Sequence, residues 1–177
     1  MVNHNHRNIT PWLIWFVASL FFASQFILRL YPGLIMNETM VVYGLDVQQY
    51  GHYASMYYIG YAGMQIPAAW FLVRFSPRYV LCLSAALCGL SAFASHVVFN
   101  WQVLYLSRFL IGVGSAFAFL GVSELITQWF PKDKYARMVG ITFTFGLFGA
   151  VYGGGASTYF IGGPGFIFFK LTSKRIN

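Results

Sequence analysis

The chain has 177 residues, of which 58% are hydrophobic and 8% are charged, and its formal net charge is +7. A soluble domain carries about a quarter charged residues, so this composition excludes an ordinary water-soluble globule. The basic residues are spread between long apolar segments instead of forming one basic face, which excludes a nucleic-acid-binding protein.

Five predominantly apolar stretches follow one another along the chain. Each is long enough to cross a bilayer, which takes about 20 residues in a helix. We predict transmembrane helices over residues 11–36, 50–75, 79–99, 103–130 and 138–161. The expected fold is therefore all-α, a polytopic membrane helix bundle of about five transmembrane helices over residues 1–161, in contact with the lipid bilayer. Residues 162–177 form a short basic tail.

Lys and Arg occupy alternate connections between these spans. The basic residues before the third span and in the connection after the fourth would all lie on one side of the membrane: Arg7, Arg74, Arg78, Lys132, Lys134 and Arg137. The connections on the other side have no Lys or Arg. Because cytoplasmic loops carry the excess of basic residues, we predict a cytoplasmic amino terminus in a multi-pass protein of a bacterial inner membrane.

The basic tail breaks this pattern. After five spans, Lys170, Lys174 and Arg175 would lie outside the cell. A sixth helix would restore the rule, but the apolar run at 165–169 is too short to cross. We therefore expect a chain that is truncated or frame-shifted where a sixth helix should begin. The alternative is a genuine five-span protein with a basic outer tail.

Three segments resemble the amino-terminal half of a major facilitator superfamily transporter. Residues 69–81, between the second and third spans, resemble its loop signature G-x-L-a-D-r-x-G-r-k, with Arg74 and Arg78 at the basic positions. Val73 stands where the signature has Asp, which weakens a latch role for the loop. The alternative is that both arginines only fix the orientation of the chain.

The second and third segments lie on the fourth and fifth spans. Arg108, Gly112 and Gly114 match the pattern R-x-x-x-G-x-G, and Gln-Trp-Phe-Pro at 128–131 precedes a glycine-rich fifth span. The resemblance covers about residues 12–161. The resemblance implies that the protein is not an enzyme. It implies a secondary transporter that works by alternating access, with about twelve helices in two halves. The small residues would let helices pack closely.

Arg29 is the candidate residue for binding a solute. The segment Phe26-Ile-Leu-Arg29 resembles the Y-L-x-R segment of organic-anion and organophosphate carriers, in which the arginine binds the negative group. An arginine inside a span is costly and faces a cavity or a partner, and its fork suits a carboxylate or phosphate. The fifth span has no histidine, which disfavours phosphate esters relative to carboxylates or amino acids. Alternatively, Arg29 snorkels to the headgroups.

Other polar residues in the spans extend this candidate site. Gln25 lies four residues before Arg29 and shares its helix face. On the second span a polar stripe either lines a cavity or packs against a neighbouring helix: Tyr50, Tyr53, Tyr57, Tyr61 and Gln65. The predicted substrate-binding set is therefore Arg29, Gln25, Tyr57, Tyr61 and Gln65.

Glu124 on the fourth span is a candidate proton carrier, or else a partner of a loop arginine. Its separation from Arg108 by sixteen residues rules out pairing between the two. We find no pattern for a cofactor, a metal ion or catalysis. The sequence predicts a fragment of a transporter for an organic anion or amino acid, with a proton as candidate co-substrate, that does not transport alone. The alternative is a membrane interaction protein, one half of a split transporter that needs a partner subunit.

Overall fold

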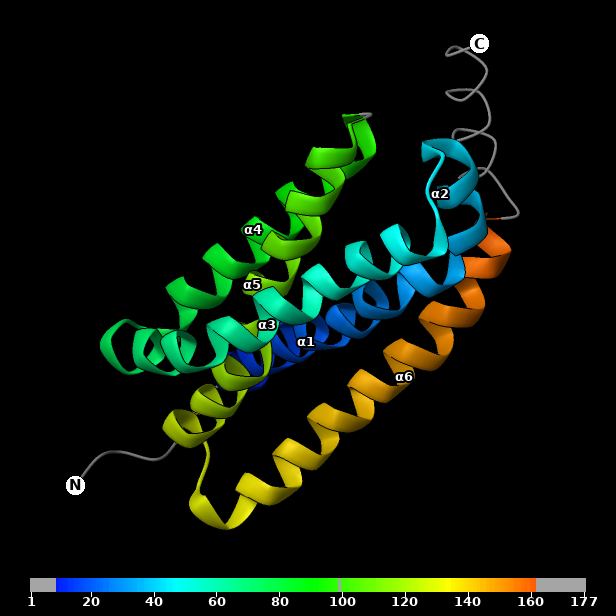
Figure 1. Cartoon of the computed structure of the whole chain (residues 1–177). Helices are drawn as coiled ribbons and strands as arrows, with labels where there is room; N and C mark the ends of the chain where they lie inside the picture. Colours follow the sequence, from blue (N-terminus) through cyan, green and yellow to red (C-terminus); the bar gives the residue numbers. More distant parts are fainter. Residues whose placement is uncertain (1–8, 99, 162–177) are drawn as a thin grey trace, which may run out of the picture.

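The computed structural model describes the backbone of residues 9–98 and 100–161, and the side chains of residues 10–151 other than 38, 42, 96 and 99. This part of the chain is helical throughout, as expected (Figure 1). Its elements are α1 (Ile9–Leu34), α2 (Met36–Tyr43), α3 (Val47–Arg74), α4 (Pro77–Val97), α5 (Trp101–Trp129), the 3-10 turn η1 (Lys132–Lys134) and α6 (Tyr135–Ile161). The prediction for 162–177 lies outside the described residues.

Each predicted span corresponds to one long helix, so the expected five-helix bundle is confirmed. The long helices begin two or three residues earlier than predicted, because a first helical turn can contain polar residues that a hydropathy pattern places in a loop. Among the described residues, three helices are long and apolar enough to cross a membrane by length and composition. These are Thr10–Leu34, Pro77–Ser95 and Trp101–Trp129.

The connection after the first span is more ordered than the sequence indicated. Residues 37–43, predicted as part of the connection after the first span, belong to helix α2, which follows α1 almost without interruption. The backbone N–H of Thr39 donates to the carbonyl of Ile35 at 3.0 Å. Gly44 ends α2 in the left-handed region with φ 62°, a conformation that favours glycine. At the start of α3, Gln49 Oε1 accepts from the backbone N–H of Asp46 at 3.1 Å.

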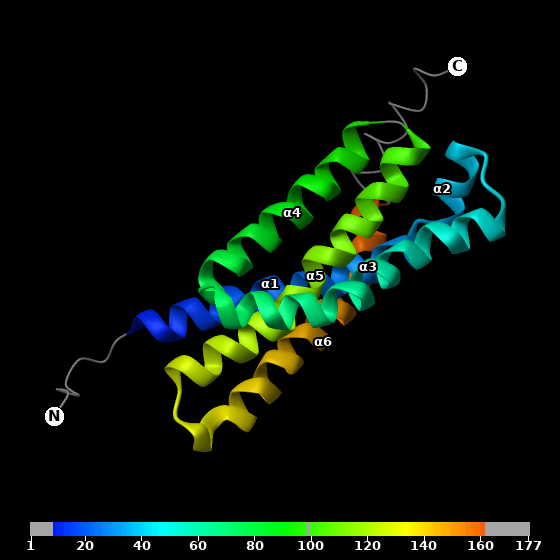
Figure 2. The ribbon, with the colours of Figure 1, turned by 60° about the vertical axis from the view of Figure 1, so that its left-hand side comes forward.

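Helix α5 lies at the centre of the bundle. It packs against α3, α4 and α1, and α6 packs along α1 (Figures 1 and 2). The α1–α6 contact includes a hydrogen bond from Trp15 Nε1 to Thr142 Oγ1 at 3.1 Å. A core of buried side chains joins α1, α4, α5 and the start of α6: Trp15, Ala18, Phe22, Leu81, Ala118, Val122, Leu125, Ile126 and Met138.

Helices α3 and α5 touch through their backbones. A Cβ atom added to Gly60 would collide with the carbonyl oxygen of Phe109, and one added to Gly112 would collide with the carbonyl oxygen of Tyr57. On the α4 side, a Cβ atom on Gly114 would lie 2.5 Å from Cys88 Sγ. Small residues allow such close approach between membrane helices, where packing replaces the hydrophobic effect as the source of association.

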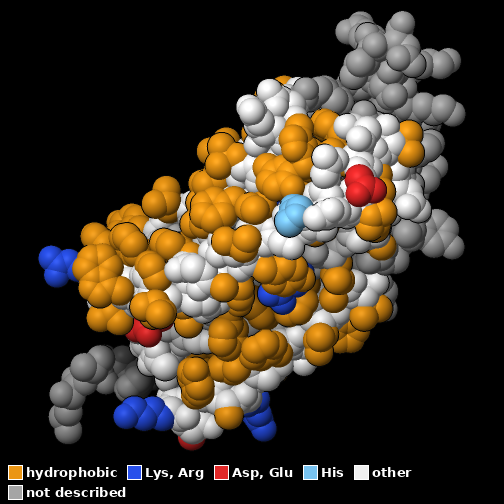
Figure 3. Space-filling model, in the orientation of Figure 1, with side chains coloured by type: hydrophobic (Ala, Val, Ile, Leu, Met, Phe, Trp, Pro, Cys, Tyr) orange, Lys and Arg blue, Asp and Glu red, His pale blue; other side chains and the backbone are white. Residues whose placement is uncertain are grey.

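The basic residues of the two connections, Arg74, Arg78, Lys132, Lys134 and Arg137, lie at one end of the bundle. The α3–α4 and α5–α6 turns lie at the end where α1 begins, and α2 lies at the opposite end (Figure 1). The surface between them is largely hydrophobic, with few charged side chains (Figure 3). At the basic end, the Arg78 guanidinium lies 4.4 Å from the centre of the Trp129 ring and links α4 to α5. The side of the membrane on which this end lies stays a prediction.

The α3–α5 contact can be tested with two glycines on the same helix. In Gly60→Ala, the new methyl group would force the helices apart, and we expect a loss of about 1–3 kcal/mol in the free energy of unfolding. Nothing lies within 4 Å of a Cβ atom at Gly63. Gly63→Ala should therefore be neutral or gain up to about 1 kcal/mol from helix propensity. Unfolding in mixed detergent micelles measures both, and equal effects of the two variants would contradict the packing described here.

Candidate functional site

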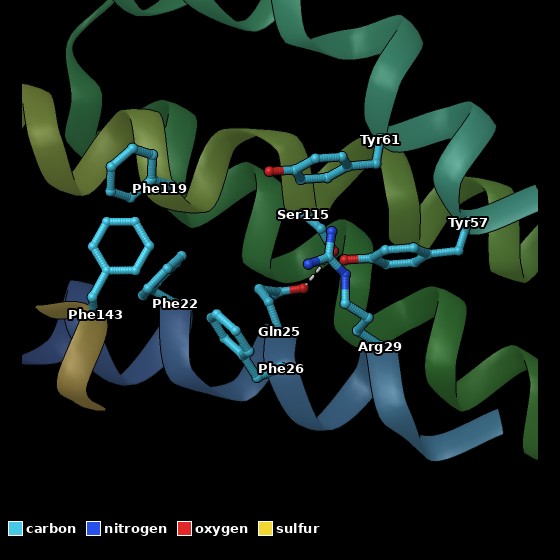
Figure 4. A pocket seen from close by; sticks show the side chains of 9 residues that line it. All are labelled: Phe22, Gln25, Phe26, Arg29, Tyr57, Tyr61, Ser115, Phe119 and Phe143. Atoms are coloured by element: carbon cyan, nitrogen blue, oxygen red, sulfur yellow. Dashed lines mark hydrogen bonds between the residues drawn. The ribbon is translucent and has the colours of Figure 1, made fainter. Parts of the chain in front are cut away.

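A cavity of about 140 Å³ lies between α1, α3, α5 and α6. Its two ends differ in chemistry, as Figure 4 shows. The polar end is lined by Gln25, Arg29, Tyr57, Tyr61 and Ser115, and the aromatic end is lined by Phe22, Phe26, Phe119 and Phe143. No residue of the lining carries a negative charge.

Arg29 extends from α1 into the polar end of this cavity. Its guanidinium carbon lies 5.2 Å from the centre of the Tyr61 ring, 5.4 Å from that of Tyr58 and 5.6 Å from that of Tyr57. Such contacts attract a cation to aromatic faces. They do not use the N–H groups, and the buried Nε has no hydrogen-bond partner among the described residues. The side chain is therefore held in place while its donors stay available.

Gln25 lies one turn before Arg29 on the same face of α1 and is 5% exposed. Its Oε1 accepts a hydrogen bond from the Ser115 hydroxyl of α5 (Figure 4). Its buried Nε2, in contrast, has no partner in the described part of the chain. A buried amide N–H without an acceptor costs about 1–3 kcal/mol. The cavity therefore contains two buried donor nitrogens and no acceptor that pairs with them.

Some of the tyrosines along α3 line the cavity, and others pack against α5. Tyr57 and Tyr61 line the cavity, with their rings stacked at 6.1 Å between centres. Tyr50 and Tyr53 are buried against Leu104 of α5. Gln65 is not among the lining residues. It lies four residues beyond Tyr61, about 6 Å further along α3, on the side of Tyr61 away from Tyr57 and Arg29. Four of the five predicted substrate-binding residues thus meet in one place.

The sequence did not reveal the aromatic end or Ser115. Phe22 and Phe26 stand seven and three residues before Arg29, which places them on the same face of α1. That spacing was the available signal. It was hidden because phenylalanine in an apolar span is also typical of a lipid-facing surface. Ser115 was hidden within a run of small residues that we assigned to helix packing.

Arg108 is buried outside this cavity and bridges three helices. It is 4% exposed; its Nε donates to the Tyr53 hydroxyl at 2.7 Å and its Nη1 to the Leu28 carbonyl at 2.9 Å. Leu28 lies four residues before Pro32, which has no N–H to donate to that carbonyl. Arg108 therefore supplies the hydrogen bond that the proline removes from α1. The Tyr50 hydroxyl donates to the carbonyl of Pro32 itself.

The remaining predicted residues lie away from the cavity. Glu124 is half-buried, and its Oε1 accepts from Gln128 Nε2 at 3.0 Å on the same helix. Arg74 ends α3 and is exposed, and Arg78 is exposed in the first turn of α4. The separation of Arg108 from Glu124 that the sequence required is also present. A proton-carrying role for Glu124 stays a prediction.

Comparison with known proteins identifies the family. The profile of the Major Facilitator Superfamily matches residues 13–170, which is most of the chain. The chain belongs to the Major Facilitator Superfamily. The resemblance that its motifs indicated is thereby confirmed, and the superfamily is one of membrane transporters and not of enzymes. No solved structure gives a significant match.

Several superfamily members are similar to the chain over part of its length. Probable anion transporter 7 of Oryza sativa subsp. japonica is 34% identical over 115 residues, 63% of this chain and 25% of that protein. The quinolone resistance transporter of Acinetobacter baumannii is 33% identical over 98 residues, 55% of this chain and 23% of that protein. The probable sulfoacetate transporter of Cupriavidus necator is 29% identical over 106 residues, 60% of this chain and 25% of that protein. The chain spans about a quarter of the length of these relatives.

A double-mutant cycle tests the role of Arg108. In Arg108→Met, the Leu28 carbonyl and the Tyr53 hydroxyl lose their partner, and we expect a loss of about 1–3 kcal/mol for each group left unpaired. Pro32→Ala restores a backbone N–H to the Leu28 carbonyl. The loss on Arg108→Met, measured by unfolding in mixed micelles, should therefore be smaller in the Pro32→Ala background.

Pro67→Ala provides the control for this cycle, because Pro67 lies inside α3 and has no hydrogen bond with Arg108. The cost of Arg108→Met should be the same with or without this change. If Arg108→Met lowers the free energy of unfolding equally in the Pro32→Ala and wild-type backgrounds, Arg108 does not replace the hydrogen bond that Pro32 removes from the Leu28 carbonyl.

Proposed function

We propose that the chain forms the amino-terminal bundle of a secondary transporter that moves a small organic anion across a membrane by alternating access. Membership of the superfamily supports the transport mechanism. The observation that carries the choice of solute is the pair of buried, unpartnered donors, Arg29 Nε and Gln25 Nε2, in one cavity. A carboxylate offers the acceptors that both nitrogens lack.

The charge of the cavity favours an anion. Arg29 is the only cation among the lining residues and no acidic residue lies beside it there, so a bound anion would compensate its charge. A carboxylate bound to the guanidinium fork forms paired, charge-assisted hydrogen bonds, which are about twice as strong as neutral ones. None of the lining residues is acidic, so nothing there would balance the ammonium group of an amino acid. An anion therefore fits better than a zwitterion.

The relatives support the same class of solute. Two of those described above carry names that refer to anions, a probable anion transporter and a probable sulfoacetate transporter. In this superfamily the solute lies between two six-helix halves. We therefore propose that a second half, on the same or on a separate chain, closes over a solute whose contacts with Arg29 and the phenylalanines this chain supplies by itself. A proton is a candidate co-substrate, with Glu124 as its carrier.

The proposal predicts that Arg29 is needed for anion binding. The purified 177-residue chain in lipid nanodiscs should bind at least one of acetate, succinate and benzoate in a saturable manner, measured by equilibrium dialysis against empty nanodiscs. Arg29→Gln should abolish this binding. Arg29→Lys should weaken it by about tenfold or more, because a point charge does not replace a bidentate fork worth about 1.5–3 kcal/mol.

Arg137→Gln is the matched control, because Arg137 is exposed at the start of α6 and lies outside the cavity. It removes the same charge from the chain and should leave binding unchanged. The proposal fails if none of the three anions binds, or if the Arg29→Gln chain binds them as the wild type does.

A further inference from the structure

We infer that the solute is a monoanion with a flat aromatic body, that is, an aromatic monocarboxylate. This inference rests on the proposed function and concerns the same cavity. It follows from what lies opposite Arg29. The cavity has one charged end and one end made of four phenylalanine rings, and each end sets a requirement for the solute.

The charged end of the cavity can balance one negative charge on the solute. Arg29 is the only cation among the nine lining residues. Arg108, the next arginine along the bundle, is engaged by the Tyr53 hydroxyl and the Leu28 carbonyl and does not line this cavity. A second carboxylate on the solute would extend toward the phenylalanines, where no donor replaces its water. Because a buried charge without a partner is strongly unfavourable, dianions are disfavoured.

The aromatic end presents both ring faces and ring edges. Phe22 lies 5.6 Å from Phe119 and 5.6 Å from Phe143 between ring centres, and Phe119 lies 4.8 Å from Phe143. Phe22 also meets Phe26 edge to face at 5.3 Å. These rings contact one another, and all four also line the cavity, where they suit a further ring in stacked or edge-to-face contact. Hydroxyl-rich solutes, in contrast, would find no hydrogen-bond partner among the four described side chains that line this end.

Helix α1 contributes residues to both ends of the cavity, and the distance between them along the helix matches the length of one small molecule. Phe26 and Phe22 stand about 4.5 Å and 10.5 Å before Arg29 along α1. A carboxylate at Arg29 therefore places an attached ring beside the phenylalanines. The cavity, at about 140 Å³, is smaller than the roughly 300–1,000 Å³ of pockets for drug-sized ligands. This size favours a small solute, such as one ring with its carboxylate.

The test compares four anions on the 177-residue chain in nanodiscs: benzoate, cyclohexanecarboxylate, acetate and succinate. Benzoate should bind about threefold to tenfold more tightly than cyclohexanecarboxylate, which has a similar size but no aromatic ring. Acetate has no ring to contact the phenylalanines, and succinate adds a second negative charge. Both should therefore bind more weakly than cyclohexanecarboxylate.

Phe119→Leu should remove the preference for benzoate over cyclohexanecarboxylate and leave the binding of acetate unchanged. Phe143→Leu, at a ring that is 42% exposed and so less important for folding, should reduce the same preference. Phe93→Leu is the control, since Phe93 is 67% exposed on α4 and lies outside the cavity. It should alter neither quantity.

The outcomes separate this inference from the proposed function. If acetate or succinate binds as tightly as benzoate and Arg29→Gln abolishes all binding, the anion site stands and the aromatic selectivity is wrong. The selectivity is also wrong if both phenylalanine variants keep the preference for benzoate. If no anion binds, both proposals are overturned.

Discussion

The hydrogen bond from Arg108 to the carbonyl of Leu28 joins the helices on which the site depends. Inside a bilayer every backbone polar group needs a partner within the protein. Pro32 removes the helical donor for the Leu28 carbonyl, next to Arg29 in the sequence, and Arg108 of α5 supplies a replacement at 2.9 Å. The same side chain donates to Tyr53 of α3. One buried arginine thereby fixes α1, α3 and α5 relative to one another.

The glycine contacts between α3 and α5 act together with this bond. Gly60 and Gly112 bring the two backbones into contact, which sets the height of Tyr57 and Tyr61 opposite α1. Arg29 can then lie against their rings with its Nε unpaired among the described residues. A looser α3–α5 contact would move the tyrosines away and let water reach the guanidinium. The close packing of glycines and the availability of the Arg29 donors are therefore parts of one arrangement.

Much of the fold could be predicted from the sequence, because span length and the distribution of basic residues are direct consequences of the bilayer. Helix α2 was missed, since polar residues such as Asn37 and Thr39 are typical of a loop and only the left-handed Gly44 marks where the helix ends. Of the site, Arg29 could be predicted as a charge inside a span and from the resemblance of its segment to organic-anion carriers, and Gln25, Tyr57 and Tyr61 from helical spacing. Gln65 follows the same spacing but does not line the cavity, because periodicity predicts which residues share a helix face and not which of them a cavity reaches.

The central claim is that Arg29 holds the carboxylate of a solute, and a distance measurement tests it most directly. Solid-state NMR on the chain in lipid, with ¹⁵N-labelled arginine and ¹³C-carboxylate-labelled benzoate, detects dipolar coupling between the carboxylate and a guanidinium. The account predicts coupling that corresponds to hydrogen bonds of about 2.7–2.9 Å, present in the wild type and in Arg137→Gln and absent in Arg29→Gln. Coupling that persists in Arg29→Gln, or none in the wild type at saturating benzoate, would contradict it.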